Sequence, residues 1–372
     1  MRGRLVLEDG TVYEGRAFGR PGTAFGEVVF NTGMTGYQEV LTDPSYCGQI
    51  VTMTYPLIGN TGICEGDSQS HRPFVRGLVV HQLCATPSHT RMIGRLDDYL
   101  YGHGILALEG VDTRALTRKL RVHGTMNGAI TSGDAPGEEL VRQLSCQGPS
   151  DLVAEVATGR PWRVFGDGPH LVVVDLGVKL NLIRYFSRHN CTVTVVPPTT
   201  PAEDILDMDP AGVLFSNGPG DPADAHAAIG TARELLGKTR LFGICLGHQV
   251  LALAMGARTF KLKYGHRGGN HPVRDLRTNH VQMTAQNHGY AVVRESLAGL
   301  GVDITHTHLH DATVEGLSHR RLPVNTLQYH PEVGPGPNDS EHLLAAFLTS
   351  LGGQAPAQKA PEFPAALAYQ GE

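Results

Sequence analysis

Short runs of alternating hydrophobic and polar residues, separated by glycine-rich turns, characterise the first half of the chain. Residues 4–7 and 11–13 flank an Asp-Gly dipeptide, which is typical of a β-hairpin turn. Residues 26–30 and 49–53 have the same strand-like composition. This pattern predicts a β-rich α+β domain.

One helix is expected within this half, at 112–122. Asp112 can cap its amino end, and Leu116, Leu120 and Val122 are expected to share its buried face.

The second half changes to continuously apolar runs that alternate with segments of helical periodicity. Such runs are typical of strands in a parallel sheet covered on both faces. We expect strands at 171–174, 191–196, 213–215, 241–244 and 324–327, and helices at 178–189, 225–236 and 249–255. The pattern predicts an α/β fold with a doubly wound, mostly parallel sheet, whose functional groups gather at the carboxyl ends of the strands.

Glycine and proline residues mark the expected domain boundaries. We expect an N-terminal domain at 1–154, a linker at 155–168 and a C-terminal domain at 169–351. The tail, 352–372, is rich in Gly, Ala, Pro and Gln and is expected to be disordered.

Composition excludes several classes of protein. The chain has 372 residues, and 31 Lys and Arg against 36 Asp and Glu give a formal net charge of −5. With no long run of like charge, neither a nucleic acid nor a membrane is expected as partner.

No apolar run reaches the ~18 residues of a membrane span, and no secretory leader is seen, so a cytoplasmic location is expected. Six cysteines without a CxxC pair argue against a disulfide or zinc framework.

The strand expected at 241–244 leads directly into a candidate nucleophile. Cys245 lies between Gly243 and Gly247, at a junction of strand and helix. A sharp turn of this kind needs residues without a Cβ on either side of its pivot. It would place the Cys245 sulfur at the positive end of a helix, which favours the thiolate, and leave the Leu246 amide to bind an oxyanion.

A candidate base follows the strand expected at 324–327. His330 and Glu332 are separated by Pro331, and side chains two residues apart on an extended segment point the same way. Glu332 can therefore orient His330 towards the thiol.

A third strand end, after 213–215, carries the sequence SNGPGDP. Its glycines, Gly218 and Gly220, could form a plain turn, or could offer bare backbone amides to a carboxylate or an oxyanion.

The motifs GICLGHQ, SNGPGDP and QYHPE together resemble the class I, or triad, glutamine amidotransferase domain. These motifs alone leave anthranilate synthase, GMP synthase and CTP synthase open. Residues 30–51 and 109–130 resemble the small subunit of carbamoyl-phosphate synthase, and the likeness spans about the whole chain except the tail.

The resemblance implies a role for each motif. Cys245 would attack the side-chain amide of glutamine and form a γ-glutamyl thioester. His330 would protonate the leaving ammonia and then activate water, while Glu332 orients His330. Amides at Leu246 and Gly218 would hold the oxyanion. The family's glutamine-binding positions match Ser45, Gly218, Gly220, Leu246, Gln249, Asn287, Gly289 and Tyr290.

Two of these positions raise structural questions. The family often has phenylalanine where this chain has Tyr290, and that change is harmless if the position uses its backbone. Ser45 lies in the other half of the chain, which predicts a pocket at or near the domain boundary.

The resemblance also implies a partner. In the family the small subunit releases ammonia into a tunnel to a large subunit, which makes carbamoyl phosphate from bicarbonate and two ATP with Mg, for arginine and pyrimidine biosynthesis. No cofactor is expected on this chain, which lacks a GxxxxGK[ST] phosphate loop. A heterodimer is expected, with larger assemblies open.

Two further features and two other functions were weighed. His306, His308 and His310 are spaced to share one strand face, but without a nearby cysteine no metal is expected. The basic segment 261–267 is expected to be a solvated or interface loop. The alternative functions are a stand-alone cysteine hydrolase or peptidase on the same fold, and a non-catalytic scaffold, which an intact Cys245, His330 and Glu332 disfavour.

Overall fold

A computed structural model describes residues 1–133, 136–146, 148, 151–332 and 334–353. The chain divides into two compact units. The first comprises Met1–Leu152 with Leu262–Gly269, and the second comprises Val153–Lys261 with the described part of Asn270–Glu372. Nearly all of the tail expected to be disordered, 352–372, lies outside the described residues. Among the described residues, no helix has both the length and the apolar character needed to cross a membrane.

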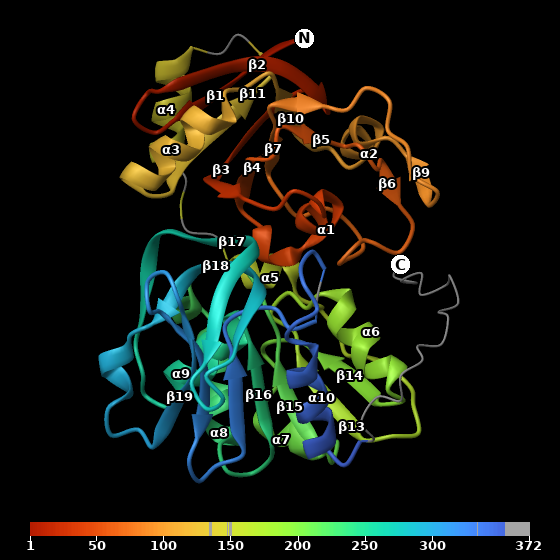
Figure 1. Ribbon diagram of the computed structural model, residues 1–372, viewed down its shortest axis with the longest axis vertical. Helices are drawn as coiled ribbons and strands as arrows, with labels where there is room; N and C mark the ends of the chain where they lie inside the picture. Colours follow the sequence, from red (N-terminus) through yellow and green to blue (C-terminus); the bar gives the residue numbers. More distant parts are fainter. Residues whose placement is uncertain (134–135, 147, 149–150, 333, 354–372) are drawn as a thin grey trace. The chain divides into compact units, whose positions relative to one another are not determined.

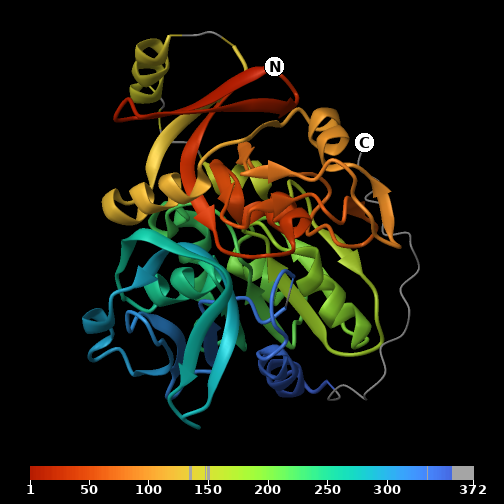
Figure 2. The ribbon, with the colours of Figure 1, turned by 45° about the horizontal axis from the view of Figure 1, so that its top comes forward.

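The first unit is built on a closed barrel, formed by the red to yellow part of the chain in Figures 1 and 2. In barrel order, its strands are β1 (Arg2–Leu7), β11 (Met126–Thr131), β3 (Thr23–Asn31), β4 (Gln49–Met53), β7 (Gly77–Val79), β10 (Leu106–Glu109) and β2 (Val12–Gly19). The predicted hairpin is confirmed, because β1 and β2 pair antiparallel. The barrel interior is apolar, with Leu5, Val28 and Ile50 fully buried.

Short elements surround the barrel. They are α1 (Tyr37–Thr42), η1 (Pro44–Tyr46), α2 (Leu96–Gly102), α3 (Thr113–His123), α4 (Gly137–Ser145), and the strand pairs β5 (Leu57–Ile58) with β8 (Gln82–Leu83) and β6 (Ile63–Cys64) with β9 (Met92–Gly94).

The predicted helix at 112–122 corresponds to α3. The Asp112 side chain caps it by accepting from the Ala115 amide at 2.8 Å, and Leu116 and Leu120 are buried. The prediction for Val122 was wrong, since this side chain is 63% exposed. Residues two apart on a helix lie on opposite sides, so Val122 faces away from Leu120.

The second unit contains a ten-stranded sheet within the described residues. In spatial order its strands are β12 (Trp162–Val164), β14 (Thr192–Val196), β13 (His170–Val174), β15 (Gly212–Phe215), β16 (Leu241–Ile244), β21 (Val324–Leu327), β20 (Val314–His319), β19 (Val302–His308), β17 (Thr259–Asp275) and β18 (Val281–Val292). The five central strands run parallel to one another: β14, β13, β15, β16 and β21. Antiparallel strands flank them, with β12 beside β14 and with β20 and then β19 beyond β21. Strand β12 comes from 155–168, the segment expected to be a linker, so that segment takes part in the sheet.

Helices cover both faces of the parallel strands (Figure 1), as the doubly wound prediction requires. Their bounds, with two single turns of 3₁₀-helix, are α5 (Leu152–Val156), α6 (Leu180–Arg188), α7 (Ala202–Leu206), η2 (Pro222–Asp224), α8 (His226–Leu235), α9 (Leu246–Ala254), η3 (Arg294–Leu297) and α10 (Glu341–Ser350).

Strand β13 shows why the sheet strands are apolar throughout. Leu171 and Val173 pack with α6 and α10, whereas Val172 and Val174 pack with α7, α8 and α9 on the opposite face. Because successive side chains point to opposite faces and both faces are covered, all four apolar positions, 171–174, are buried. Each such side chain contributes roughly 1.5–3 kcal/mol through burial.

The basic segment 261–267 was expected to be a solvated or interface loop, and the expectation of a loop was wrong, whereas a role at an interface stays a prediction. It forms part of β17, and although Lys261 and Lys263 are exposed, His266 and Arg267 are buried in the first unit. Backbone pairing explains the difference, since the amide of Thr32 donates to the Arg267 carbonyl at 3.2 Å.

Candidate active site

The carboxyl ends of two neighbouring parallel strands supply the candidate nucleophile and base. Ile244 of β16 lies opposite Leu327 of β21, and the Cys245 amide donates to the Leu327 carbonyl at 2.8 Å. His330 follows Leu327 by three residues. The strand order of the sheet therefore places the two segments side by side, as the sequence predicted.

Cys245 lies at a sharp turn between β16 and α9. Its φ of 54° and ψ of −105° are strained for a residue with a side chain. A Cβ at Gly243 would lie 2.5 Å from the Gly247 carbonyl oxygen, and one at Gly247 would lie 2.0 Å from the Phe215 carbonyl oxygen. Both glycines are therefore required by close backbone contacts, which is the physical basis of the motif.

The Cys245 thiol is buried, with 2% of the residue exposed, and precedes the first turn of α9. The positive end of that helix favours the thiolate. The sulfur lies 3.5 Å from the carbonyl oxygen of Asn287, to which it donates a hydrogen bond. This contact places the nucleophile beside residues 287–290 of β18.

His330 is held by a buried chain of charged groups. Its Nδ1 donates to Glu332 Oε1 at 2.7 Å, and the Nζ of Lys179 donates to the same oxygen at 2.9 Å. The His330 amide also donates to the Ala285 carbonyl at 3.0 Å. Among the described residues, the His330 Nε2 has no hydrogen-bond partner. That nitrogen is left free to exchange a proton with a nearby thiol or leaving group.

The electrostatics keep Glu332 ionised. Burial alone would raise the pKa of this carboxyl group, but the charges of Lys179 and His330 and their hydrogen bonds lower it to about 2. A permanent carboxylate holds the His330 ring in one orientation and stabilises its protonated form.

Lys179 was missed by the sequence analysis. It lies between β13 and α6 and is 2% exposed, among the largest fully buried side chains of the chain. Its position just beyond the carboxyl end of a buried strand was the available signal, because functional groups of such sheets gather there.

Two backbone amides face this region. The Leu246 amide is the first of α9, and neither it nor the Gly218 amide donates a hydrogen bond within the part of the chain that the structure describes. A Cβ added at Gly218 would lie 2.8 Å from the Leu246 side chain, so the two residues are adjacent. Such a pair of donors can stabilise an oxyanion.

The other predicted glutamine-binding positions fall into three groups. Gln249 on α9 donates to the Tyr290 carbonyl at 2.7 Å, which ties it to Asn287, Gly289 and Tyr290 on β18. The Tyr290 backbone takes part in this contact, while the part of Tyr290 in binding glutamine stays a prediction.

Gly220 and Ser45 lie elsewhere. Gly220 is exposed, with a φ of +90° that favours glycine. Ser45 belongs to the first unit, where it is buried and its amide donates to Asp43. Its part in binding glutamine stays a prediction, as does a pocket at the domain boundary.

The histidine-rich strand differs from the prediction that three rings share one face. Strand β19 ends at His308, and its register shifts on either side of His306. His306 packs against Tyr329, whereas His308 packs against His271 and against the ring of His310, which is exposed beyond the strand. The bulge and the strand end break the alternation on which the prediction rested.

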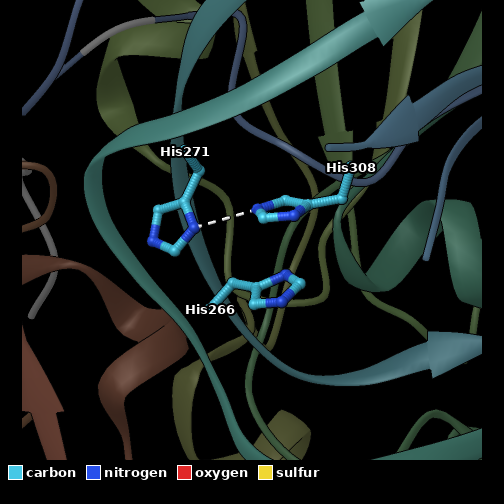
Figure 3. A group of neighbouring side chains, drawn as sticks. All are labelled: His266, His271 and His308. Atoms are coloured by element: carbon cyan, nitrogen blue, oxygen red, sulfur yellow. Dashed lines mark hydrogen bonds between the residues drawn. The ribbon is translucent and has the colours of Figure 1, made fainter. Parts of the chain in front are cut away.

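Figure 3 shows the rings of His271 and His308 facing each other, with Nδ1 of His271 3.1 Å from Nε2 of His308. The amide of His310 donates to Nδ1 of His308, so the His308 proton lies on Nε2 and points at His271. These two rings are thus arranged as a hydrogen-bonded pair, and the expectation of no metal stays a prediction.

Comparisons with known proteins agree with this geometry. A family model described as carbamoyl-phosphate synthase small chain, CPSase domain, matches residues 5–130, and one described as glutamine amidotransferase class-I matches 172–350. A carbamoyl phosphate synthase small chain from Symbiobacterium thermophilum is 54% identical over 354 residues, 92% of this chain and 96% of that protein. Another, from Bacillus caldolyticus, is 51% identical over 352 residues, 94% of this chain and 97% of that protein.

Among solved structures, a glutamine amidotransferase from Thermotoga maritima aligns with a TM-score of 0.37 at 19% identity. The alignment covers 50% of this chain and 84% of that chain, and the similarity is too distant to bear on the assignment.

The parallel sheet, the strained cysteine turn and the buried histidine–glutamate pair are those of a class I glutamine amidotransferase domain. The N-terminal unit and the near full-length relatives narrow the assignment further. The chain belongs to the carbamoyl phosphate synthase small chain family.

Proposed function

We propose that this chain hydrolyses L-glutamine to glutamate and ammonia, as the glutaminase subunit of a carbamoyl-phosphate synthase. The observation that carries the proposal is that the strained turn at Cys245 follows β16 beside β21, whose carboxyl end leads to a His330 held by Glu332 and Lys179. A nucleophile, a base and an orienting group are the three elements of covalent amide hydrolysis.

The reaction proceeds in two halves. The Cys245 thiolate attacks the side-chain amide carbon of glutamine, and the oxyanion that forms is held by the amides of Leu246 and Gly218. His330 gives a proton to the leaving nitrogen, the C–N bond breaks, and a γ-glutamyl thioester remains. Water, deprotonated by His330, then attacks the thioester, which releases glutamate and restores the thiolate. Glu332 and Lys179 stay in place throughout.

The ammonia passes to a large synthetase subunit, which consumes bicarbonate and two ATP with Mg. This chain itself needs no cofactor, because the thiol and imidazole supply the chemistry. Channelling has a physical reason, since ammonia in bulk water at neutral pH is mostly ammonium, which is not a nucleophile. The near full-length similarity to proteins named small chains supports this partnership and disfavours a stand-alone hydrolase or peptidase.

Substituting Cys245 tests the proposal. In complex with the large subunit, Cys245→Ser should abolish carbamoyl phosphate synthesis from glutamine and leave synthesis from ammonia unchanged. The glutamine analogue 6-diazo-5-oxonorleucine should label Cys245, as read by mass spectrometry.

Cys191→Ala is the matched control, because Cys191 is also a buried free thiol but lies at the start of β14. It should retain both activities. Loss of ammonia-dependent synthesis in Cys245→Ser would indicate a structural role, and labelling of Cys191 would overturn the assignment of the nucleophile.

A further inference from the structure

A buried cluster of polar side chains adjoins residues 287–290 and takes no part in the proposed reaction. His288 is 5% exposed, and its Nδ1 lies 2.7 Å from the carbonyl oxygen of Tyr290. Since a carbonyl oxygen only accepts, Nδ1 carries a proton and donates it. The same carbonyl accepts from Gln249 Nε2 at 2.7 Å. The Tyr290 backbone is therefore held from two sides.

The second ring nitrogen of His288 contacts another side chain of β18. Its Nε2 lies 2.8 Å from Gln286 Oε1. The amide nitrogen of Gln286 donates to Oε2 of Glu315 at 3.0 Å and to the Thr284 hydroxyl at 3.2 Å. Glu315 lies on β20 and is fully buried. A chain of hydrogen bonds thus runs from Glu315 through Gln286 and His288 to the Tyr290 carbonyl.

The side-chain amide of Gln286 links the protonation states of His288 and Glu315, because its oxygen can only accept a hydrogen bond and its nitrogen can only donate one. With Oε1 towards His288, the ring carries protons on both nitrogens and Glu315 is a carboxylate. With the amide turned over, His288 is neutral and Glu315 holds the proton. In either arrangement Glu315 and His288 share one proton and have no net charge, which suits a buried site.

The surroundings of Glu315 oppose its ionisation. Burial raises the pKa of Glu315 well above its usual value, and the Asp311 charge acts in the same direction, while hydrogen bonds from Thr313 and Gln286 oppose the shift.

We propose that Glu315, acting through Gln286, is a positioning residue that fixes the His288 ring and, with it, the Tyr290 backbone beside the nucleophile. The inference rests on the proposed function and on the predicted glutamine-binding positions Asn287, Gly289 and Tyr290. Glu315 does not touch the substrate. Its loss therefore loosens the binding segment and raises KM for glutamine, while the thiol and the base keep their geometry and kcat changes little.

Steady-state glutamine hydrolysis by variants in complex with the large subunit tests this role. Glu315→Leu and Gln286→Leu should each raise KM for glutamine about tenfold, with kcat within about threefold. Glu315→Gln should stay close to the wild type, because its side-chain oxygen can still accept from the Gln286 amide. Thr313→Val is the matched control, since it removes the hydrogen bond from the Thr313 hydroxyl to Glu315 Oε1, at 3.2 Å and outside the chain, and KM should change less than about twofold.

The double variant Glu315→Leu/Gln286→Leu should be no worse than either single variant, because both interrupt one chain. An unchanged KM in Glu315→Leu, or a Glu315→Gln variant as impaired as Glu315→Leu, would overturn the inference. Ammonia-dependent synthesis reports an intact complex, and if Glu315→Leu does not fold, Gln286→Leu carries the same test. Failure of the proposed function differs, because the wild-type complex would then hydrolyse no glutamine.

Discussion

At the scale of single residues, the site depends on buried charges that compensate one another. Lys179 and Glu332 are both nearly inaccessible to solvent, and their Nζ–Oε1 distance is 2.9 Å. Removing one partner of such a pair leaves the other charge uncompensated, which costs about 3–5 kcal/mol. The same contact positions His330, so stability and activity depend on one interaction.

Lys179→Met should therefore lower the free energy of unfolding by about 3–5 kcal/mol, as measured by chemical denaturation at neutral pH. Lys179→Met/Glu332→Gln should recover much of this loss, because no buried charge then stands alone. A single variant as stable as the wild type would contradict the ion pair.

The pH dependence of stability follows from the same pair. The pKa of Glu332 is lowered to about 2 in the folded chain from the ordinary 4.5. Its contribution is therefore fully present above pH 4.5 and is lost as the pH falls towards 2. In Lys179→Met the carboxyl group loses its main compensating charge, so its folded-state pKa should rise and its contribution to stability above pH 4.5 should shrink.

At the scale of elements, the turn between β16 and α9 leaves no room for side chains at its two glycines. Gly247→Ala would bring a Cβ within 2.0 Å of the Phe215 carbonyl oxygen, which belongs to the neighbouring strand β15. The backbone must shift to relieve this contact, and the shift moves Cys245.

We expect Gly247→Ala to lower the free energy of unfolding by at least about 3 kcal/mol and to abolish glutamine hydrolysis. Gly230→Ala is the matched control, since Gly230 lies within α8 with no atom within 4 Å of an added Cβ. That variant should gain about 0.5–1 kcal/mol of stability and keep its activity. Thermal and chemical unfolding measure both, and equal effects of the two substitutions would refute the steric argument.

At the scale of the whole molecule, the two units are not contiguous in sequence. Residues 262–269, in the middle of β17, group with the first unit. There the Lys263 carbonyl accepts from the Thr125 amide at 2.9 Å, and the Arg267 carbonyl accepts from the Thr32 amide. A boundary drawn at a single point of the chain therefore removes part of the first unit.

A fragment of residues 1–152 should consequently lose protection at the Thr32 and Thr125 amides. Hydrogen exchange at these amides is expected to be at least about a hundredfold faster than in the intact chain. The Leu7 amide, which donates to Thr11 within the first hairpin at 2.9 Å, is the internal control and should stay protected. Equal protection in fragment and intact chain would show that 262–269 is dispensable.

The local sequence determined those features whose cause is local. Gly243 and Gly247 predict a sharp turn at Cys245, because only residues without a Cβ fit on either side of it. The spacing of His330 and Glu332 predicts a contact between their side chains, because an extended backbone points both the same way. The apolar runs predicted the parallel sheet, because strands covered on both faces have no polar face.

Tertiary structure decided the features that depend on residues distant in the chain. Lys179 meets Glu332, which lies far along the chain, only because β13 and β21 end at the same edge of the sheet. The bulge in β19 separates His306 from His308, and pairing with the first unit buries part of 261–267. Periodicity describes each segment alone, whereas burial and charge compensation depend on which segments meet.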